Sequence, residues 1–258
     1  MEPNRRTCRA ALLALAVIAA IAAPASAAPT GCPEKFAGGE APDIVNERLL
    51  SRAAELCYDE FAVLHSGLTK TPVWAAQHLT ADAVVAGRAV EREDNFHPEP
   101  SLPEDQRAEL SDYSGSGYDR GHLAPAADFA THEGQAQSFS LANIIPQTPE
   151  NNRVLWRDIE SITRDLAIRH GEVYVVTGPM FIGDTLDALA GRVVVPTHVF
   201  KAIYVPATGE AGAYVTTNTA VPEWQRVPVA TLNAAVGMDL FPFLPPENKA
   251  ALMALPEP

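Results

Sequence analysis

The chain has 258 residues, of which 47% are hydrophobic and 20% are charged. This composition supplies enough apolar side chains for a substantial core, and it excludes intrinsic disorder. No G-X-Y period or sustained heptad repeat is present, which excludes collagen-like and coiled-coil folds. The formal net charge of -13 argues against a broad basic surface for nucleic acid, although it leaves room for a local basic cleft.

Residues 1–27 have the three-part pattern of a secretory signal peptide. Three arginines within the first nine residues precede an apolar run over 10–22, and small residues follow at 25–27. The apolar run is shorter than the roughly 20 residues that span a bilayer, which disfavours a membrane anchor. We therefore expect export to the periplasm or the medium, with no stable membrane association after cleavage at or next to Ala27.

Cleavage would remove Cys8 together with three arginines and Glu2, so the mature chain would carry a net charge of -15. It would keep Cys32 and Cys57. Two cysteines in an exported protein predict a disulfide, here between an N-terminal arm and the first helical segment. No Cys-x-x-Cys pair or Cys/His cluster suggests a zinc site.

The N-terminal half of the mature chain predicts few regular elements. Proline and glycine over 28–43 predict an extended arm, and the apolar spacing over 44–56 predicts a short helix. A strand is expected over 61–65, followed by a turn at 68–71 before the apolar residues 73–75. Three prolines among acidic residues over 94–105 predict a surface loop.

The C-terminal half is richer in β-branched and aromatic residues. Strands are expected over 172–177, 192–195, 198–205 and 213–217, a helix over 226–236, and the end of the core at 241–246. Strands separated by loops and a few helices, without regular crossover helices, predict an α+β domain with a mainly antiparallel sheet. No repeat or linker divides the chain, so we expect one domain over 28–258.

The sequence Asp119-Arg120-Gly121-His122 carries the first chemical signal. Glycine permits close backbone approach, arginine presents a fork for phosphate oxygens, and histidine accepts a proton near neutral pH. This set suits the attack of water on a phosphodiester. On spacing alone, a purely structural role for His122 is as good an interpretation.

A helix with two different faces follows. Its apolar stripe consists of Leu155, Ile159, Ile162 and Leu166, and its polar side of Arg153, Arg157, Glu160 and Arg164. The polar side is either a solvated face with an Arg157–Glu160 pair or a phosphate-facing arginine surface. Asn152, at the start of this helix, is in isolation better explained as an N-cap than as a hard oxygen ligand for Mg²⁺.

Taken together, these motifs resemble the DNA/RNA non-specific endonucleases, which are ββα-metal nucleases with a DRGH motif. The resemblance rests on the DRGH block, on Leu141-Ala142-Asn143-Ile144-Ile145-Pro146-Gln147, and on Asn152 with Glu160 eight residues later. It extends to Trp74, Asp112-Tyr113, Val176–Pro179 and Pro196–Lys201. The resemblance implies a ββα-metal finger on a mixed core, with a central, mainly antiparallel sheet flanked by helices.

The resemblance also implies roles for the site residues. His122 would be the general base, Arg120 would stabilise charge on the phosphate, and Asn143 would fix the geometry of the site. Asn152 would bind a single Mg²⁺, with Mn²⁺ or another divalent ion as the alternative, and Glu160 would hold the metal-bound waters. The expected substrate-binding arginines are Arg92 (or Arg88 in its place), Arg153, Arg157 and Arg164.

The sequence thus predicts an exported endonuclease that hydrolyses DNA and RNA with little sequence specificity. Phosphate contacts without base readout account for the weak specificity. The alternatives are a phosphodiesterase acting on smaller esters and a catalytically inactive nucleic-acid-binding relative. A zinc hydrolase is disfavoured because His122, His132 and Glu133 lack zinc-ligand spacing. The oligomeric state is not predicted.

Overall fold

The structure is a computed structural model that describes Met1 and residues 30–258. Apart from its first residue, the predicted signal peptide lies outside the described residues. Among the residues that are described, no helix has the length and apolar character needed to cross a membrane. The helices are α1 (Ala81–Gly87), α2 (Leu110–Tyr113), α3 (His132–Ser138), α4 (Arg157–His170), α5 (Val229–Val236) and α6 (Pro246–Ala250).

A seven-stranded sheet forms the centre of the molecule, with the strand order β12-β11-β10-β7-β4-β3-β2. The strands are β2 (Ala53–Cys57), β3 (Phe61–Ser66), β4 (Thr71–Thr80), β7 (Glu172–Met180), β10 (His198–Val205), β11 (Glu210–Thr217) and β12 (Trp224–Val227). Every neighbouring pair is antiparallel, as the spacing of the elements predicted. Strands β3, β7 and β10 are almost wholly buried because layers cover both faces of the sheet.

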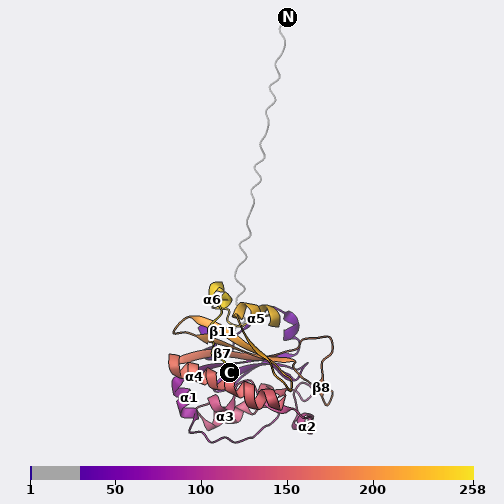
Figure 1. Cartoon of the computed structure of the whole chain (residues 1–258). Coiled ribbons are helices and arrows are strands. Elements are labelled where there is room, and N and C mark those ends of the chain that lie inside the picture. The colour runs from indigo at the N-terminus through magenta and orange to yellow at the C-terminus, as the bar shows by residue number, and fades with distance from the viewer. Residues whose placement is uncertain (2–29) are drawn as a thin grey trace.

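Helices cover both faces of this sheet (Figure 1). Helices α1, α3 and α4 lie on one face, where Trp156 and Ile159 pack into a core with strand residues such as Val175 and Ile203. Helices α5 and α6 lie on the other face, above a second core that includes Trp74. The α+β class with a central antiparallel sheet is therefore confirmed.

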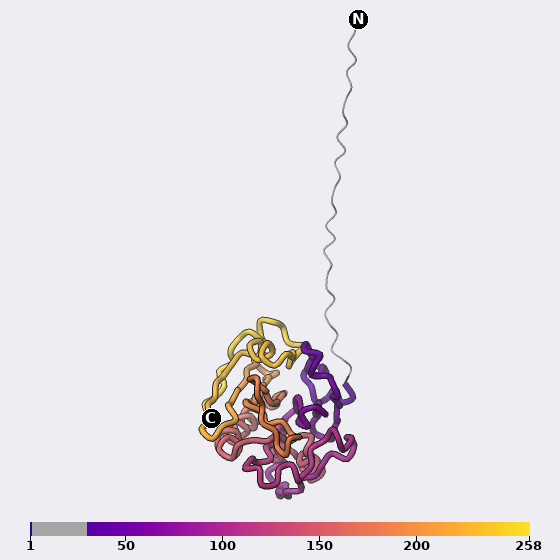
Figure 2. The backbone as a smooth tube through the Cα atoms, turned by 90° about the vertical axis from the view of Figure 1, so that its right-hand side faces the viewer, coloured from indigo at the N-terminus to yellow at the C-terminus, as the bar shows by residue number. Residues whose placement is uncertain are grey.

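The N- and C-terminal parts of the described chain lie side by side on the α5 side of the sheet (Figure 2). Strand β1 (Asp43–Ile44) pairs there with β13 (Met238–Asp239). A further short pair, β8 (Ala188–Leu189) with β9 (Val193–Val194), lies at the end of the molecule near α2.

The ββα unit is a separate hairpin followed by a helix. Strand β5 (Asp119–His122) pairs with β6 (Ile144–Gln147), and Asp119 faces Gln147 across the pair. A π-helical stretch, η6 (Asn151–Trp156), then leads directly into α4. This arrangement is the ββα finger that the resemblance implied, and it is carried on the α4 face of the sheet.

The prediction of a helix over 44–56 is wrong. Only Glu47–Leu50 forms a helical turn, a 3₁₀ turn (η3), and Ala53–Cys57 forms edge strand β2. Arg52 between them has a φ of 57°, in the left-handed region, which ends the turn and starts the strand. Pairing with β3 then overrides the helical spacing.

The arm predicted over 28–43 is not simply extended. It contains two 3₁₀ turns, η1 (Pro33–Lys35) and η2 (Ala37–Gly39), and Phe36 between them is buried edge-on against Trp74 at a centroid distance of 5.6 Å. The predicted disulfide between Cys32 and Cys57 is present. It joins this segment to strand β2 rather than to a helix.

The other predicted strands are found with shifted ends. Strand β7 continues through Gly178-Pro179, because a glycine there lets the Phe200 ring pack directly on the backbone. The strand predicted over 192–195 shortens to β9, and β12 occupies the start of the helix predicted over 226–236. The core also extends beyond 246, since α6 follows and Met253 and Leu255 are buried.

Candidate active site

His122 ends strand β5 and is buried, with 8% of its surface exposed. Its ring packs against Phe139 at 4.9 Å and 86° and against Phe96 at 5.3 Å and 50°. Its Nε2 atom is buried without a hydrogen-bond partner among the described residues. Burial, and secondarily the positive charge of Arg92, lower the pKa of His122 to about 3. The imidazole is therefore neutral at neutral pH, and its Nε2 atom is not engaged by another group of the described chain.

Two arginines flank this cluster of three rings. The guanidinium carbon of Arg120 lies 4.2 Å from the centre of the Phe96 ring, and that of Arg92 lies 5.3 Å from the centre of the Phe139 ring. Arg120 is two residues before His122 in β5, so both side chains point to the same face of the strand. The rings thus hold the histidine and both cations in one arrangement.

Asn143 is fully buried beneath this arrangement, at the end of the 3₁₀ turn η5 (Leu141–Asn143). Its Oδ1 accepts a hydrogen bond from the Ala124 N–H at 3.0 Å, and its Nδ2 donates to the carbonyl oxygens of Ala124 and Ser138. The Leu123 N–H also donates to the Asn143 carbonyl. Asn143 therefore fixes the backbone immediately after His122.

Asn152 does not cap a helix. It lies inside η6, whose N-cap position is Glu150, so the capping interpretation is wrong. Its Nδ2 donates to Asp119 Oδ2 at 2.9 Å, which leaves Oδ1 without a partner among the described residues. Arg153 also donates to both oxygens of Asp119. Asp119 thus orients the amide so that its oxygen is the uncommitted atom.

Glu160 follows two turns later, on α4. Burial raises the pKa of its carboxyl group to about 7, against the opposing effect of the nearby Lys201 ammonium. No hydrogen bond to this carboxylate is found in the described part of the chain. The Asn152 amide oxygen and the Glu160 carboxylate are uncommitted hard oxygen donors, the type that suits a divalent cation such as Mg²⁺.

Lys201 is a buried cation near Glu160, and the sequence did not predict it as part of the site. It is 1% exposed, its Nζ donates to Thr177 Oγ1 at 2.8 Å, and it lies 5.4 Å from the centre of the Trp156 ring. Burial lowers its pKa, while Glu160 opposes that shift. The sequence feature that could have indicated Lys201 is that it is the single lysine inside the apolar strand His198–Val205.

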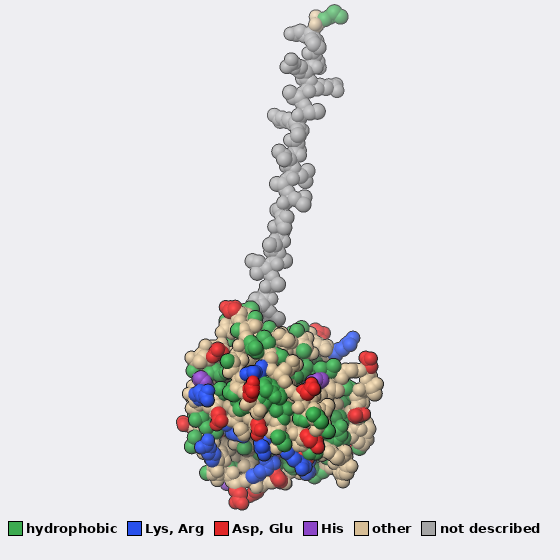
Figure 3. All heavy atoms as spheres, viewed as in Figure 1, with side chains coloured by type: hydrophobic (Ala, Val, Ile, Leu, Met, Phe, Trp, Pro, Cys, Tyr) green, Lys and Arg blue, Asp and Glu red, His purple; other side chains and the backbone are tan. Residues whose placement is uncertain are grey.

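The predicted arginine surface is only partly assembled. Arg153 is bound to Asp119, and the exposed Arg157 pairs with Asp158 at 3.2 Å rather than with Glu160. Arg164 donates to Asp128 Oδ1 at 2.9 Å. The two upstream candidates, Arg88 and Arg92, line one pocket of about 350 Å³ together with Arg164. Lys and Arg side chains gather on the lower front of the molecule, below α4 (Figure 3).

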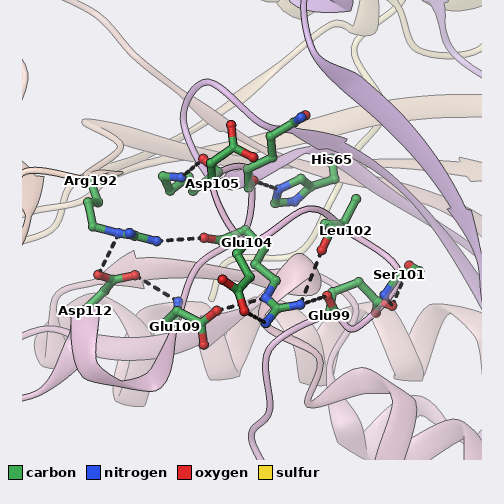
Figure 4. Close-up of polar contacts among 12 residues, drawn as sticks. His65, Glu99, Ser101, Leu102, Glu104, Asp105, Glu109, Asp112 and Arg192 are labelled. Atoms are coloured by element: carbon green, nitrogen blue, oxygen red, sulfur yellow. Dashed lines mark hydrogen bonds and ion pairs between the residues drawn. The ribbon is translucent and has the colours of Figure 1, made fainter.

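The loop between α1 and α2, together with α2 itself, is fastened by a polar network (Figure 4). Arg192 pairs with Asp112 at 3.1 Å, Arg107 pairs with Glu109 at 2.8 Å, and His65 Nε2 lies 2.9 Å from the Gln106 carbonyl oxygen. Glu99, in the same loop, accepts hydrogen bonds from Tyr58 and Ser140. This loop carries Phe96, so the network ties the ring cluster to the sheet.

Comparison with known proteins identifies the family to which the chain belongs. Residues 43–247 match the family described as DNA/RNA non-specific endonuclease. Nuclease C1 of Cunninghamella echinulata var. echinulata is 36% identical over 178 residues, which cover 63% of this chain and 71% of the relative. A nuclease of Nostoc sp. is 40% identical over 168 residues, which cover 63% of this chain and 59% of the relative.

The mitochondrial nuclease EXOG of Xenopus laevis is 35% identical over 210 residues, which cover 72% of this chain and 58% of the relative. The chain thus spans less than two thirds of two of these three relatives. Among solved structures, a chain of the EndoG/EndoGI complex superposes with a TM-score of 0.70 at 25% identity, over 79% of this chain and 93% of its own length. The chain therefore belongs to the DNA/RNA non-specific endonuclease family, whose members are enzymes that hydrolyse phosphodiester bonds.

Proposed function

We propose that the chain is an endonuclease that hydrolyses DNA and RNA with little sequence specificity, and that residues 28–258 form its single nuclease domain. The observation that carries the proposal is the neutral His122, whose Nε2 has no partner among the described residues, beside Arg120 on the ββα finger. Within this proposal, His122 accepts the proton of the attacking water. Arg120 stabilises the charge that builds on the phosphate.

The same proposal includes one divalent ion of the Mg²⁺ type, in keeping with the divalent-metal dependence of the family. Asn152 Oδ1 would hold the ion directly, and Glu160 would hold the waters around it. When bound, such an ion neutralises phosphate charge and assists the departure of the 3′-oxygen. Asp119 keeps the Asn152 amide in the required orientation.

We infer weak sequence specificity from the kind of groups that surround His122. The charged groups beside the ring cluster of His122 are the guanidinium groups of Arg92 and Arg120, and such groups contact phosphates rather than read bases. The acidic net charge repels a polyanion at long range, so binding relies on the local arginines and the metal.

We also propose that the mature protein works outside the cytoplasm, in a periplasm or the medium. The Cys32–Cys57 disulfide and the signal-like pattern at 1–27 support this proposal, because disulfides persist in oxidising compartments. Mass analysis of the protein from periplasmic and culture fractions tests it. A protein found only in the cytoplasm with an intact N-terminus would contradict it.

The test of the nuclease function is digestion of plasmid DNA and of RNA, with Mg²⁺ and with EDTA. We expect both substrates to be cut only with metal, and His122→Ala to lose at least about a hundredfold in kcat. His132→Ala, at an exposed histidine of α3, is the matched control and should keep full activity. Asn152→Ala should need a higher metal concentration for half-maximal rate.

The other outcomes separate the alternatives. Full activity in His122→Ala would overturn the assignment of the base. Hydrolysis of bis(4-nitrophenyl) phosphate without any cleavage of polynucleotides would indicate a phosphodiesterase for small esters. Binding of DNA without hydrolysis of either substrate would indicate an inactive relative.

A further inference from the structure

Lys201 occupies a core position of strand β10. Side chains alternate between the two faces of a strand, and the neighbours two residues away, Val199 and Ile203, are fully buried in the core on the α4 face. Lys201 is itself 1% exposed, and a lysine is rarely buried to this extent unless it is paired. Because burial of an ammonium group costs free energy, a well-packed apolar side chain would serve the core at least as well. The packing of the core therefore does not account for a lysine here.

The Lys201 ammonium group is fixed by two neutral acceptors. Its Nζ donates to Thr177 Oγ1 at 2.8 Å, and these two residues face each other across the β10–β7 pair. It also donates to the carbonyl oxygen of Leu123, the residue after His122, at 3.4 Å. An ammonium group has three N–H donors, so one donor has no partner among residues 30–258. The two acceptors hold the group in place, but neither neutralises its charge.

Glu160 lies on the helix face that covers Lys201. The Trp156 ring, whose centre is 5.4 Å from Lys201 Nζ, precedes Glu160 by four residues, and residues with this spacing share one face of a helix. Burial raises the pKa of Glu160 to about 7, and the charge of Lys201 opposes this shift more strongly than that of Arg164 does. Since no side chain of the described chain donates to the Glu160 carboxylate, the charge of Lys201 is its main compensation.

Asp128, the other carboxylate that acts on Lys201, is already engaged. Its Oδ1 accepts a hydrogen bond from Arg164 at 2.9 Å, and its Oδ2 accepts one from the Gln77 amide at 2.5 Å. Burial lowers the pKa of Lys201, and Glu160 opposes this shift more strongly than Asp128 does. The buried charges therefore form two pairs. Arg164 compensates Asp128, and Lys201 compensates Glu160.

We propose that Lys201 is a positioning residue of the hydrolytic site, as the fixed counter-charge of the Glu160 carboxylate. This inference rests on the function proposed above, in which Glu160 holds the waters around one divalent ion. A carboxylate in that role needs a fixed orientation, and outer partners of this kind supply it. Because the ammonium is bound both to the sheet and to the segment after His122, it holds Glu160 in register with the base. Lys201 acts through Glu160 and touches no reacting atom.

The first test is a double-mutant cycle of Lys201→Met and Glu160→Gln, followed by thermal unfolding of the metal-free protein in EDTA. Both changes remove a charge and keep the approximate shape of the side chain. Each single change leaves the other charge buried without its partner, whereas the double change removes both charges. We therefore expect the double variant to unfold about 4 °C above the temperature that the sum of the two single shifts gives.

The second test measures hydrolysis of plasmid DNA by the same variants with Mg²⁺. We expect Lys201→Met to lower kcat about tenfold with little change in KM, and to lower it by less than about twofold when Glu160→Gln is already present. Lys249→Met is the matched control. Lys249 is a 9% exposed lysine of α6 that pairs with Asp239 at 2.5 Å on the opposite face of the sheet from α4. This control should change the unfolding temperature and leave kcat unchanged.

Additive shifts of the unfolding temperature, or additive losses of kcat, would overturn the assignment of Lys201 to Glu160. Full kcat in Lys201→Met would overturn it as well. Lys201→Gln, which keeps an N–H donor without the charge, should behave like Lys201→Met and replaces it in the cycle if that variant does not fold. An unmodified protein that cuts no nucleic acid would instead overturn the nuclease function, while the unfolding cycle in EDTA would still decide whether the two charges are paired.

Discussion

At the scale of single residues, His122, the proposed base, is held in an unusual way. A catalytic histidine is often oriented by a hydrogen bond from one ring nitrogen to a carboxylate or carbonyl group. No such bond to His122 is found within residues 30–258, and two phenylalanine rings fix its plane instead. The same rings carry Arg92 and Arg120. A change in either ring would thus move base and cations together.

The burial of His122 predicts a pH dependence of stability. Its pKa is about 3 in the folded protein, whereas a histidine in an unfolded chain titrates near 6.5. Between these values the unfolded chain binds more protons, so the free energy of unfolding falls as the pH falls below about 6.5. The stability that the unmodified protein has over His122→Asn should therefore shrink by about 2 kcal/mol from pH 7 to pH 5.

Urea unfolding at each pH measures this difference. His65 is also buried with a lowered pKa, but it is present in both proteins and cancels. A difference that stays constant over the whole range would show that His122 is hydrated in the folded protein.

The sequence predicts site residues from the order of its motifs, but it says nothing of their environment. The residues predicted in this way include His122, Asn152 and Glu160. Phe96 and Phe139 could not be placed beside His122, because each is distant from it along the chain and neither stands in a motif. The interpretation of Asn152 as an N-cap failed for a local reason: the π-helical stretch already starts at Asn151, two residues earlier than an N-cap at Asn152 would require.

At the scale of elements, two contacts hold the β5–β6 hairpin in shape. Gly121 is needed because any side chain there would collide with Gln147 on the paired strand. Asn143 joins the turn before β6 to the segment after β5 through three side-chain hydrogen bonds. The glycine of the DRGH motif therefore serves the packing of the hairpin.

Asn143→Ala is expected to loosen this hairpin. It leaves three buried backbone groups without partners, so the free energy of unfolding should fall by about 3 kcal/mol. The rate constant kcat should fall as well, because the backbone after His122 is released. Asn248→Ala, which removes one hydrogen bond to Gly209 on the far side of the sheet, should lower stability by about 1 kcal/mol and leave kcat unchanged. An unchanged kcat in Asn143→Ala would contradict its supporting role.

The elements themselves were predictable where both faces of a strand are buried. The strands β3, β7 and β10 read as continuous β-branched and aromatic runs and were found with shifts of a few residues at most. The edge strand β2 was mistaken for a helix, because its residues are only half-buried and pairing with β3 decides its form. Tertiary pairing of this kind has no signature within a single segment.

At the scale of the whole molecule, the disulfide fastens the N-terminal segment to the sheet. The two cysteines are 25 residues apart in the sequence. Phe36 lies within the loop that the disulfide closes, and it packs on Trp74, which lies outside that loop. Replacing both cysteines by serine is expected to lower the free energy of unfolding by about 3 kcal/mol. Thermal unfolding with and without reductant measures the effect. An unmodified protein that is insensitive to reductant would contradict it.

Strand β2, which the disulfide anchors, is also one of the two outermost strands of the sheet. Thr30 reaches Glu55 of this strand, Cys32 is bonded to Cys57, and Lys35 reaches the Asp59 carbonyl just beyond it. An open outer strand is a template for pairing with a second chain, so the segment over 30–35 acts as a guard against self-association. The disulfide is the covalent part of this guard, and its reduction would leave only the side-chain contacts of Thr30 and Lys35. We therefore expect the reduced protein to aggregate more readily than the oxidised protein.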